Sequence, residues 1–385
     1  MKKVLILTGS YLPGKKSAGV TTSLYNMIKD VHSIDFYILT EDRDIGEKEA
    51  YIDVKLEEWT KYENANVFYS RKYIMSMLKF RQIILSQSFD IYYINGFYNI
   101  KDNLRFFILY FFRLIPRKKI VIAPRGIFSM GEYNNREILR YIYRTVFKLS
   151  RLSKSVYWHA TSILEKNDII KYFKNAEYRI SVIPNLSGIS IGNNISNKLC
   201  KSKGEIRILF ISRISEKKNI KFILETLKSV TGNIKFDIYG MIGTTDDKNY
   251  FDQCLNMMKE LPSNVECQYY GTIDHEKVPE LYKKHHLFFF PTFGENYGHV
   301  IAESLAYGCP LLLSDTTPWN MINDYGAGWV INLKDKSLFK EKLQECINMN
   351  QLEWEKLSIN AIKVAKDYID NNNISLKYKE FFQNL

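Results

Sequence analysis

The chain has 385 residues, of which 46% are apolar and 25% are charged, a composition typical of a globular protein large enough for two domains. No apolar run reaches the roughly 20 residues that a membrane-spanning helix needs, and the apolar stretch near the start is too short for a signal peptide. The five cysteines are scattered without metal-type spacing. They therefore indicate a reducing, cytoplasmic setting without a disulfide framework.

The net charge of +12 is unevenly distributed along the chain. Residues 101–158 alone contain 13 Lys and Arg and 3 Asp and Glu, a net +10. A basic segment of this kind suits an anionic partner: nucleic acid, an anionic membrane or a phosphorylated substrate. No nucleic-acid-binding motif accompanies the charge, so no nucleic acid partner is expected.

In chain order, residues 3–8 form a continuous apolar run typical of a buried parallel strand. A glycine-containing loop follows, and residues 20–31 then have helical spacing. This order suggests a phosphate-binding turn. However, Gly9, Gly14 and Gly19 are five residues apart and do not match the G-x-G-x-x-G dinucleotide fingerprint. An ordinary connection between a strand and a helix is the alternative.

The same alternation continues through the chain, and it predicts an α/β protein with two doubly wound parallel sheets. In the first half we expect strands at 34–40, 90–95, 119–123, 156–160 and 180–184, and helices near 70–87, 99–114, 134–152 and 162–173. The polar segment 189–204 reads as a linker between a first domain, 1–188, and a second, 205–365. In the second domain we expect strands at 206–212, 234–240, 265–270, 286–291 and 310–314, helices at 218–230, 247–260, 277–284, 298–307 and 317–323, and a helical tail from about 335.

The most informative stretch is residues 286–310, an apolar strand, a turn at Gly294 and a helix from about Gly298. The start of such a helix offers free backbone N–H groups and a favourable dipole to an anion. Glu295 and Glu303 flank this turn, eight residues apart. An acid beside a bound anion makes sense if it accepts hydrogen bonds from hydroxyl groups, such as those of a sugar and a ribose. A capping glutamate and an unrelated surface glutamate are the alternative.

The sequence G-E-N-Y-G-H-V-I-A-E resembles the E-x7-E signature of retaining glycosyltransferase family 4. The resemblance implies the GT-B fold, two Rossmann-like domains facing a cleft, with a last helix, within 366–385, that crosses back to the first domain. It also implies that Glu295 orients the transferred sugar and Glu303 holds the ribose. The donor-binding residues between them would be Asn296, Tyr297, Gly298 and His299, although a packed helix histidine is as good an interpretation of His299.

Residues 212–219 resemble the family's G-R-x-x-x-E-K segment, with Ser212 in place of the glycine. Arg213 and Lys218 then match the residues that bind the donor diphosphate, and Lys217 is the register alternative to Lys218. A solvated basic turn is the other interpretation. The resemblance also places the backbone of Gly19 near the diphosphate. Thr272 and Ile273 are the candidates for holding the base.

Two further segments match a subgroup of the family. Ala123-Pro-Arg-Gly stands where many members carry a histidine that contacts the sugar, so Arg125 becomes the candidate for binding an acceptor phosphate or the sugar. An arginine paired with a carboxylate at the domain interface is the alternative. Asp315-Thr-Thr-Pro-Trp319 matches the subgroup without indicating a chemical role.

The basic segment contains two aromatic, helix-like stretches. The apolar part of 104–115 is expected to be core. Basic residues recur every three or four positions in the next stretch and predict one stripe, which could rest on an anionic membrane or be a solvated face: Arg136, Arg140, Arg144, Lys148 and Arg151.

Together these features predict a retaining glycosyltransferase that moves a hexose-type sugar from a UDP- or GDP-sugar to a saccharide acceptor. A lipid-linked acceptor, as in bacterial surface polysaccharide synthesis, would suit the basic first domain. No metal or cofactor is expected, and the enzyme would be cytoplasmic, peripheral on the inner face of the membrane. The alternatives are a GT-B nucleotide-sugar 2-epimerase and a non-catalytic subunit that binds nucleotide sugars.

Overall fold

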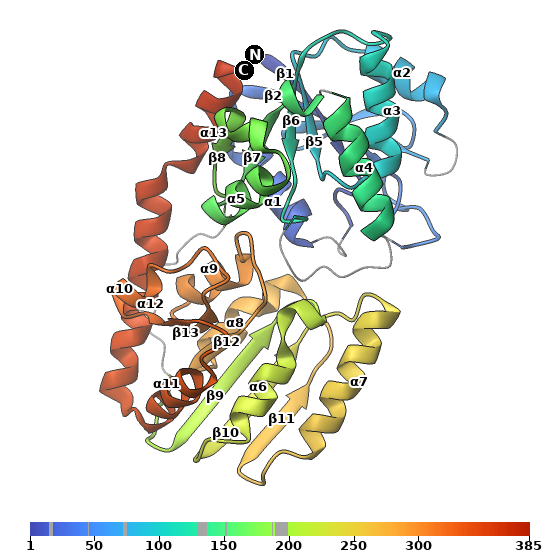
Figure 1. Ribbon diagram of the computed structural model, residues 1–385. Coiled ribbons are helices and arrows are strands. Elements are labelled where there is room, and N and C mark those ends of the chain that lie inside the picture. The colour runs from blue at the N-terminus through green and yellow to red at the C-terminus, as the bar shows by residue number, and fades with distance from the viewer. Residues whose placement is uncertain are drawn as a thin grey trace. The chain divides into compact units, whose positions relative to one another are not determined.

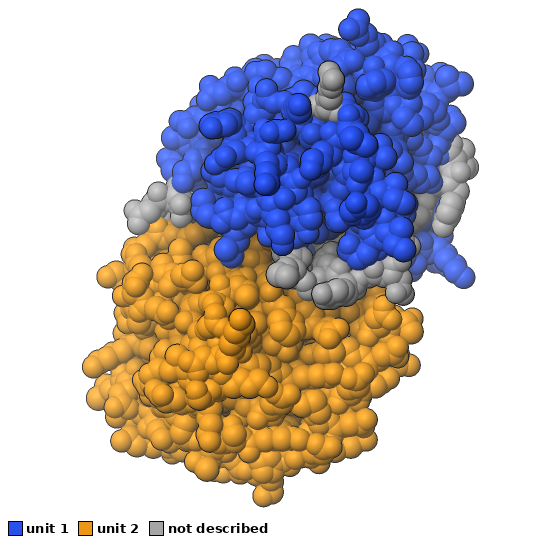
Figure 2. Space-filling model, in the orientation of Figure 1, with its two compact units in different colours: residues 1–186, 373–385 blue, residues 187–372 orange. Residues whose placement is uncertain are grey.

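The computed structural model describes residues 1–14, 18–44, 46–71, 75–128, 137–150, 152–186, 188 and 199–385. Contacts divide the chain into two compact units (Figure 2). The first comprises residues 1–186 and 373–385, and the second residues 187–372. Most of the predicted linker, 189–204, lies outside the described residues.

The first unit is built on an eight-stranded sheet with the strand order β3-β4-β2-β1-β5-β6-β7-β8 (Figure 1). All neighbours pair in parallel except β3, an edge strand that runs antiparallel to β4. Its strands are β1 (Lys2–Thr8), β2 (Ile34–Glu41), β3 (Trp59–Tyr62), β4 (Ala65–Ser70), β5 (Ile91–Asn95), β6 (Lys119–Ala123), β7 (Tyr157–Ala160) and β8 (Ile180–Val182). Its α-helices are α1 (Ala18–Asp30), α2 (Met77–Leu85), α3 (Ile100–Phe111), α4 (Glu137–Leu149), α5 (Ile163–Tyr172) and α13 (Ile374–Asn384).

The second unit is an all-parallel six-stranded sheet in the Rossmann order β11-β10-β9-β12-β13-β14. Its strands are β9 (Glu205–Ile211), β10 (Asn233–Tyr239), β11 (Val265–Tyr269), β12 (Leu287–Phe290), β13 (Leu311–Ser314) and β14 (Gly328–Ile331). Its α-helices are α6 (Ile220–Leu227), α7 (Thr245–Lys259), α8 (Val278–Lys283), α9 (His299–Ala306), α10 (Ile322–Tyr325), α11 (Lys336–Asn348) and α12 (Gln351–Asn372). The central strand β12 is fully buried, as expected for the run Leu-Phe-Phe-Phe between two layers of helices.

The predicted fold class, two Rossmann-like parallel sheets, is confirmed. Three strands were not predicted: the hairpin of β3 and β4, and β14. The helix expected at 317–323 is wrong in position, because α10 covers only Ile322–Tyr325. Trp319 instead lies in the loop between β13 and α10, where its buried indole N–H donates to the Tyr297 carbonyl oxygen.

The last helix of the chain packs on the first unit. The Phe382 ring contacts the rings of Phe36 and Tyr93, and the Tyr378 ring contacts His159. The preceding helix α12 belongs to the second unit, and the chain turns at Asn373, whose φ of 35° is in the left-handed region. Among the described residues, no helix combines the length and the apolar character that a membrane crossing requires.

Candidate active site

The second sheet has its topological switch point between β9 and β12, where the strand order reverses direction. These strands are parallel neighbours, with Phe288 opposite Leu209, so the loops that follow both strands leave the same edge of the sheet. Ligands of open α/β sheets bind outside the carboxyl ends of the strands at such a point. Residues 212–219 and 291–298 are those two loops, which places the two strongest motifs of the sequence next to each other.

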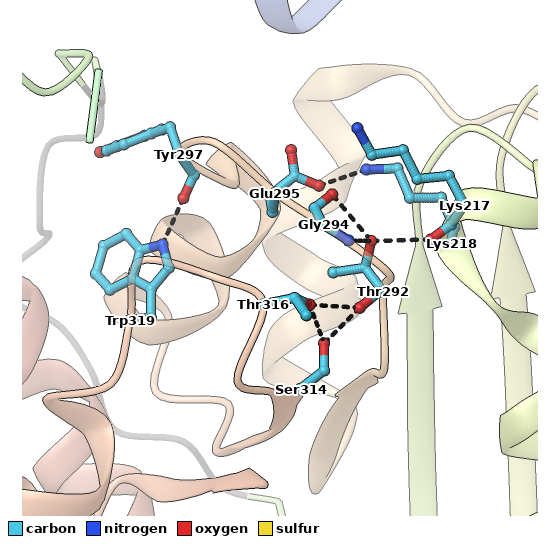
Figure 3. Close-up of polar contacts among 9 residues, drawn as sticks. All are labelled: Lys217, Lys218, Thr292, Gly294, Glu295, Tyr297, Ser314, Thr316 and Trp319. Atoms are coloured by element: carbon cyan, nitrogen blue, oxygen red, sulfur yellow. Dashed lines mark hydrogen bonds and ion pairs between the residues drawn. The ribbon is translucent and has the colours of Figure 1, made fainter. Parts of the chain in front are cut away.

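The side chains of Lys218 and Glu295 meet across these loops as an ion pair (Figure 3). They are only 14% and 20% exposed, and the Lys218 ammonium also lies 5.1 Å from the centre of the Phe290 ring. Partial burial strengthens such a pair relative to one on an open surface. The structure therefore brings together a cation and an acid that the sequence analysis had named separately.

Lys217 and Lys218 contact the second loop in different ways. The Lys217 carbonyl oxygen accepts hydrogen bonds from the Phe293 N–H at 2.8 Å and from the Thr292 hydroxyl at 3.0 Å. Asn219 adopts a left-handed conformation, with a φ of 60°, and donates from its buried amide to the Pro291 carbonyl oxygen at 3.0 Å. Lys217 thus joins the two loops through its backbone, whereas the Lys218 side chain reaches Glu295. No role was predicted for Asn219, an asparagine whose side chain suits that conformation.

A cluster of hydroxyl groups supports the loop that carries Glu295 (Figure 3). The Ser314 and Thr316 hydroxyls both donate to the Thr292 carbonyl oxygen at 2.6 Å. The Glu295 N–H donates to the Thr316 carbonyl oxygen at 3.1 Å. The run Ser-Asp-Thr-Thr-Pro-Trp, to which the sequence analysis assigned no role, therefore forms the support beneath this loop, together with the bond from Trp319 to Tyr297 described above.

The loop ends at Gly298, where α9 begins. Gly298 has a φ of 78°, and a Cβ at this position would lie 2.8 Å from Ile301 Cδ1 and 3.1 Å from Glu295 Cγ. Glycine adopts this positive φ without strain, and it has no Cβ to press against Ile301 and Glu295. The first-turn amides of α9 therefore start directly beside the Lys218–Glu295 pair, in the arrangement that favours a bound anion.

The remaining motif residues of this segment differ in exposure. Tyr297 is buried and its ring packs on His299 and Trp319, so its side chain is part of the core. Asn296 and His299 are half-buried. Of these residues, Asn296 is the one whose side chain is neither fully buried nor packed on an aromatic neighbour.

Glu303 lies on α9, nearly buried, and its carboxylate contacts Nε2 of His275 at 3.1 Å. The His275 side chain is largely exposed, and the hydrogen bond with Glu303 raises the pKa of its imidazole above the usual value. His275 was not predicted as a partner. It follows the Gly-Thr-Ile segment, in which Thr272 is exposed and Ile273 packs partly into the core.

Arg213 lies in the loop directly after β9. It is exposed and its side chain runs beside Gly243, where a Cβ would lie 3.7 Å from Arg213 Cδ. The end of the neighbouring strand β10 packs closely on this loop, since a Cβ at Gly240 would lie 1.8 Å from the Ser212 carbonyl oxygen. The structure thus puts Arg213 at the same sheet edge, facing the start of α7.

The two candidates of the first unit have different surroundings. Gly19 lies exposed in the first turn of α1, with open space around the position of a Cβ. Arg125 is half-buried and its guanidinium donates to Asn95 Oδ1 at 2.6 Å, Asn185 Oδ1 at 2.9 Å and the Tyr93 hydroxyl at 3.1 Å. These bonds identify Arg125 as a residue that holds three segments of the first unit together.

The Arg125 network continues to a buried histidine. His159 contacts the Tyr93 hydroxyl through Nδ1 at 2.6 Å and the Ile183 carbonyl oxygen through Nε2 at 2.9 Å. Burial, with a smaller effect of the Arg125 charge, lowers the pKa of His159 to about 3. The imidazole is therefore neutral and structural near neutral pH.

Of the predicted basic stripe on 134–152, Lys148 is exposed as expected, but the direction is wrong for Arg140 and Arg144. Arg136 and Arg151 lie outside the described residues, but Arg140 and Arg144 turn toward the protein and pack on Tyr98. Apolar residues of α4 face solvent instead. Similarly, the expectation that the apolar part of 104–115 is core holds for Phe106, Phe107 and Leu109 but is wrong for its exposed side chains.

Comparisons with known proteins agree with the fold. Residues 193–365 match the family model described as "Glycosyl transferases group 1". An uncharacterized 41.2 kDa protein from the cps region of Klebsiella pneumoniae is 25% identical over 134 residues, which is 34% of each chain, so the match spans about a third of that relative.

Several solved structures share the fold over the whole chain. Sucrose-phosphate synthase of Thermosynechococcus elongatus has a TM-score of 0.71 at 12% identity, covering 100% of this chain and 99% of the other. HepE of Anabaena, solved with UDP-glucose, has a TM-score of 0.70 at 15% identity and full coverage of both chains. The lipopolysaccharide outer core galactosyltransferase WaaB has a TM-score of 0.67 at 17% identity, also with full coverage of both.

Proposed function

We propose that this chain, which carries a group 1 glycosyltransferase domain within a GT-B fold, transfers a hexose from a nucleotide sugar to a saccharide acceptor with retention of anomeric configuration. The observation that carries the proposal is the meeting of Lys218 and Glu295 at the β9–β12 switch point, directly beside the start of α9. A cation, an acid and a helix N-terminus at one point suit a ligand that has an anionic half and a hydroxyl-rich half.

In the proposed complex, the donor diphosphate competes with Glu295 for the Lys218 ammonium. A diphosphate carries more charge than one carboxylate, so it draws Lys218 away and is further stabilised by the first-turn amides of α9. Arg213, at the same sheet edge, adds a second cation. Glu295, released from Lys218, then accepts hydrogen bonds from the sugar hydroxyls, and Glu303 accepts those of the ribose.

The proposed reaction is a front-face displacement. The bond between the anomeric carbon and the diphosphate oxygen breaks with both electrons moving to the phosphate, and the acceptor hydroxyl oxygen bonds to the same face of that carbon. The leaving phosphate takes the acceptor proton. Lys218 and Arg213 stabilise the charge that builds on the leaving group, which is the part of the reaction where such groups contribute most. We propose that these groups make a metal ion unnecessary.

We further propose a UDP- or GDP-hexose as donor and a lipid-linked saccharide of a surface polysaccharide as acceptor, with the enzyme in the cytoplasm and peripheral on the membrane. The UDP-glucose in HepE, the cps-region relative and the lipopolysaccharide transferase WaaB support this choice. The basic segment 101–158 agrees with an anionic, lipid-linked substrate.

A thermal-shift screen of UDP-, GDP- and ADP-sugars tests the donor assignment. A ligand present at 100 times its Kd stabilises the folded protein by about 2.7 kcal/mol, which is a measurable rise in Tm. The best donor is then incubated with extracted lipid-linked saccharides, and the anomeric configuration of the product is read by NMR. Inversion of configuration would contradict the mechanism. A free epimer formed without acceptor would identify a 2-epimerase, and binding without turnover would identify an accessory subunit.

A further inference from the structure

Helix α4 turns apolar side chains toward solvent and arginines toward the protein. Ile138 is 79% exposed and Leu149 76%, whereas the side chain of Arg140 is only 13% exposed. Leu139, Ile142 and Val146 are exposed as well. A surface helix of a globular protein normally has the opposite arrangement. A cluster of exposed apolar side chains on one helix face marks an interaction site.

Specific contacts hold α4 in this orientation. The Arg144 guanidinium donates to the Tyr98 hydroxyl at 2.6 Å and lies 4.8 Å from the centre of the Tyr172 ring. Arg140 lies over the Tyr98 ring at 5.1 Å. Two arginines and two tyrosines thus occupy the inner side of the helix beside its buried residues, and the apolar residues are left on the outer side.

Helix α3 extends the same surface. Figure 1 shows α3 and α4 side by side, and the rings of Phe107 and Phe147 are in contact at 5.3 Å. The outer side of α3 and the turn after it are also apolar, with Phe112 66% exposed. We define the apolar α3–α4 face by these exposed side chains: Leu104, Ile108, Phe111, Phe112, Leu114, Ile138, Leu139, Ile142, Val146 and Leu149.

Exposed basic residues border this face. It lies within the segment 101–158, whose net charge is +10. Both helices connect parallel strands, so they run in the same direction and share one end. Exposed basic residues gather at and after that end: Arg113, Arg117, Lys148 and Lys154.

We propose that the apolar α3–α4 face lies in the surface of a bilayer that contains anionic lipids. Its apolar side chains would enter the boundary between headgroups and acyl chains, and the basic residues would contact the headgroup phosphates. A second copy of this chain is a poor occupant, because it would bring two segments of net charge +10 together. This inference rests on the proposed function in one respect: the membrane contact would give the enzyme access to a lipid-linked acceptor.

Flotation with vesicles tests the proposal. Full-length protein is mixed with vesicles of equal parts phosphatidylethanolamine and phosphatidylglycerol, or with phosphatidylcholine alone. We expect binding to the first and little to the second. The double substitution Phe112→Ser with Ile142→Ser should weaken binding at least about tenfold, because two apolar anchors are lost. The matched control, Leu352→Ser with Ile359→Ser, changes two exposed apolar residues of α12 in the second unit and should bind like the unchanged protein.

Three results would overturn the proposal: no binding of the unchanged protein to anionic vesicles, equal binding of the Phe112 and Ile142 variant, or self-association of the protein that the same variant abolishes. Circular dichroism and the thermal shift with the nucleotide-sugar donor are measured on every variant. Retained donor binding with lost flotation supports the membrane face. If the unchanged protein binds no donor, that result counts against the proposed function. Flotation then still tests the membrane face by itself.

Discussion

The ammonium group of Lys218 pairs with the carboxylate of Glu295 across the switch point between β9 and β12. In this state each group satisfies the other. Under the proposed function, each changes partner when the nucleotide-sugar donor binds. The two residues should therefore respond differently to substitution, although they form one ion pair.

Glu295→Gln should lower kcat by about 10²-fold or more, because the amide cannot offer the sugar the same negatively charged acceptor. The measurement is steady-state release of nucleoside diphosphate with saturating donor. Lys228→Gln is the matched control, since Lys228 forms a comparable ion pair with Glu260 on the outside of the same unit, and its rate should be unchanged. If Glu295→Gln turns over at the normal rate, Glu295 has no role in the reaction.

The contact between His275 and Glu303 predicts a pH dependence of donor affinity. The hydrogen bond raises the pKa of His275, so the imidazole stays charged above its ordinary titration range and holds Glu303. As the pH rises through this raised pKa, the charge is lost, Glu303 becomes available to the ribose and the donor Kd should fall. His275→Gln should flatten this dependence. The donor Kd is measured from pH 6 to 9 for both proteins. If the variant has the same pH profile as the unchanged protein, His275 does not cause the pH dependence.

The same pair has a predictable effect on stability. Because the folded-state pKa of His275 lies above the unfolded value, its contribution to folding is fully present below the unfolded pKa and is lost as the pH rises through the folded pKa. The side chain is largely exposed, so we expect a small effect.

Arg125 should act chiefly on stability. Arg125→Gln removes a guanidinium that makes three hydrogen bonds and leaves the side-chain oxygens of Asn95 and Asn185 without this donor. We expect a loss of about 2–4 kcal/mol in the free energy of unfolding, measured by urea denaturation. Arg117→Gln, an exposed control in the same unit, should cost less than about 0.5 kcal/mol. Full stability with lost transfer to acceptor would instead support the acceptor-binding role expected from the sequence.

His159 should make the protein sensitive to acid. Its pKa is lowered to about 3 in the folded state, so below the ordinary pKa of about 6.5 only the unfolded chain takes up the proton. Stability should then fall by about 1 kcal/mol per pH unit between pH 6 and 4 through this group alone. His159→Gln should reduce that slope in urea titrations repeated at each pH. A slope unaffected by the substitution would show that the histidine is accessible to protons in the folded state.

Local pattern predicted most of the fold, because strands such as β1 and β12 are continuous apolar runs followed by helical spacing. The hairpin of β3 and β4 escaped prediction because its edge strand, Trp-Thr-Lys-Tyr, is half exposed and lacks an apolar run. Periodicity places residues on one side of a helix but does not say which side faces inward. Hence the arginines of α4 were found at the right spacing and assigned the wrong direction, since the aromatic partner Tyr98 comes from a distant part of the sequence.

The candidate site was partly predictable for the same reason. Glu295, Gly298 and Glu303 belong to one short motif, whereas the pairing of Lys218 with Glu295 joins residues 77 positions apart and needs the sheet order. The contact of His275 with Glu303 and the supporting hydroxyls of Ser314 and Thr316 also depend on which strands are neighbours. Such contacts leave no local signal in the sequence.

Calorimetric titration of the nucleotide-sugar donor into the unchanged protein, the Lys218→Gln variant and the Glu295→Gln variant tests most directly whether this pair forms the donor site. We predict that Lys218→Gln raises the donor Kd by about 10- to 100-fold, equivalent to the loss of one charge-assisted contact, while Glu295→Gln leaves it unchanged or lowers it because Lys218 loses a competitor. Equal affinity in all three proteins, or a large loss with Glu295→Gln alone, would contradict the assignment.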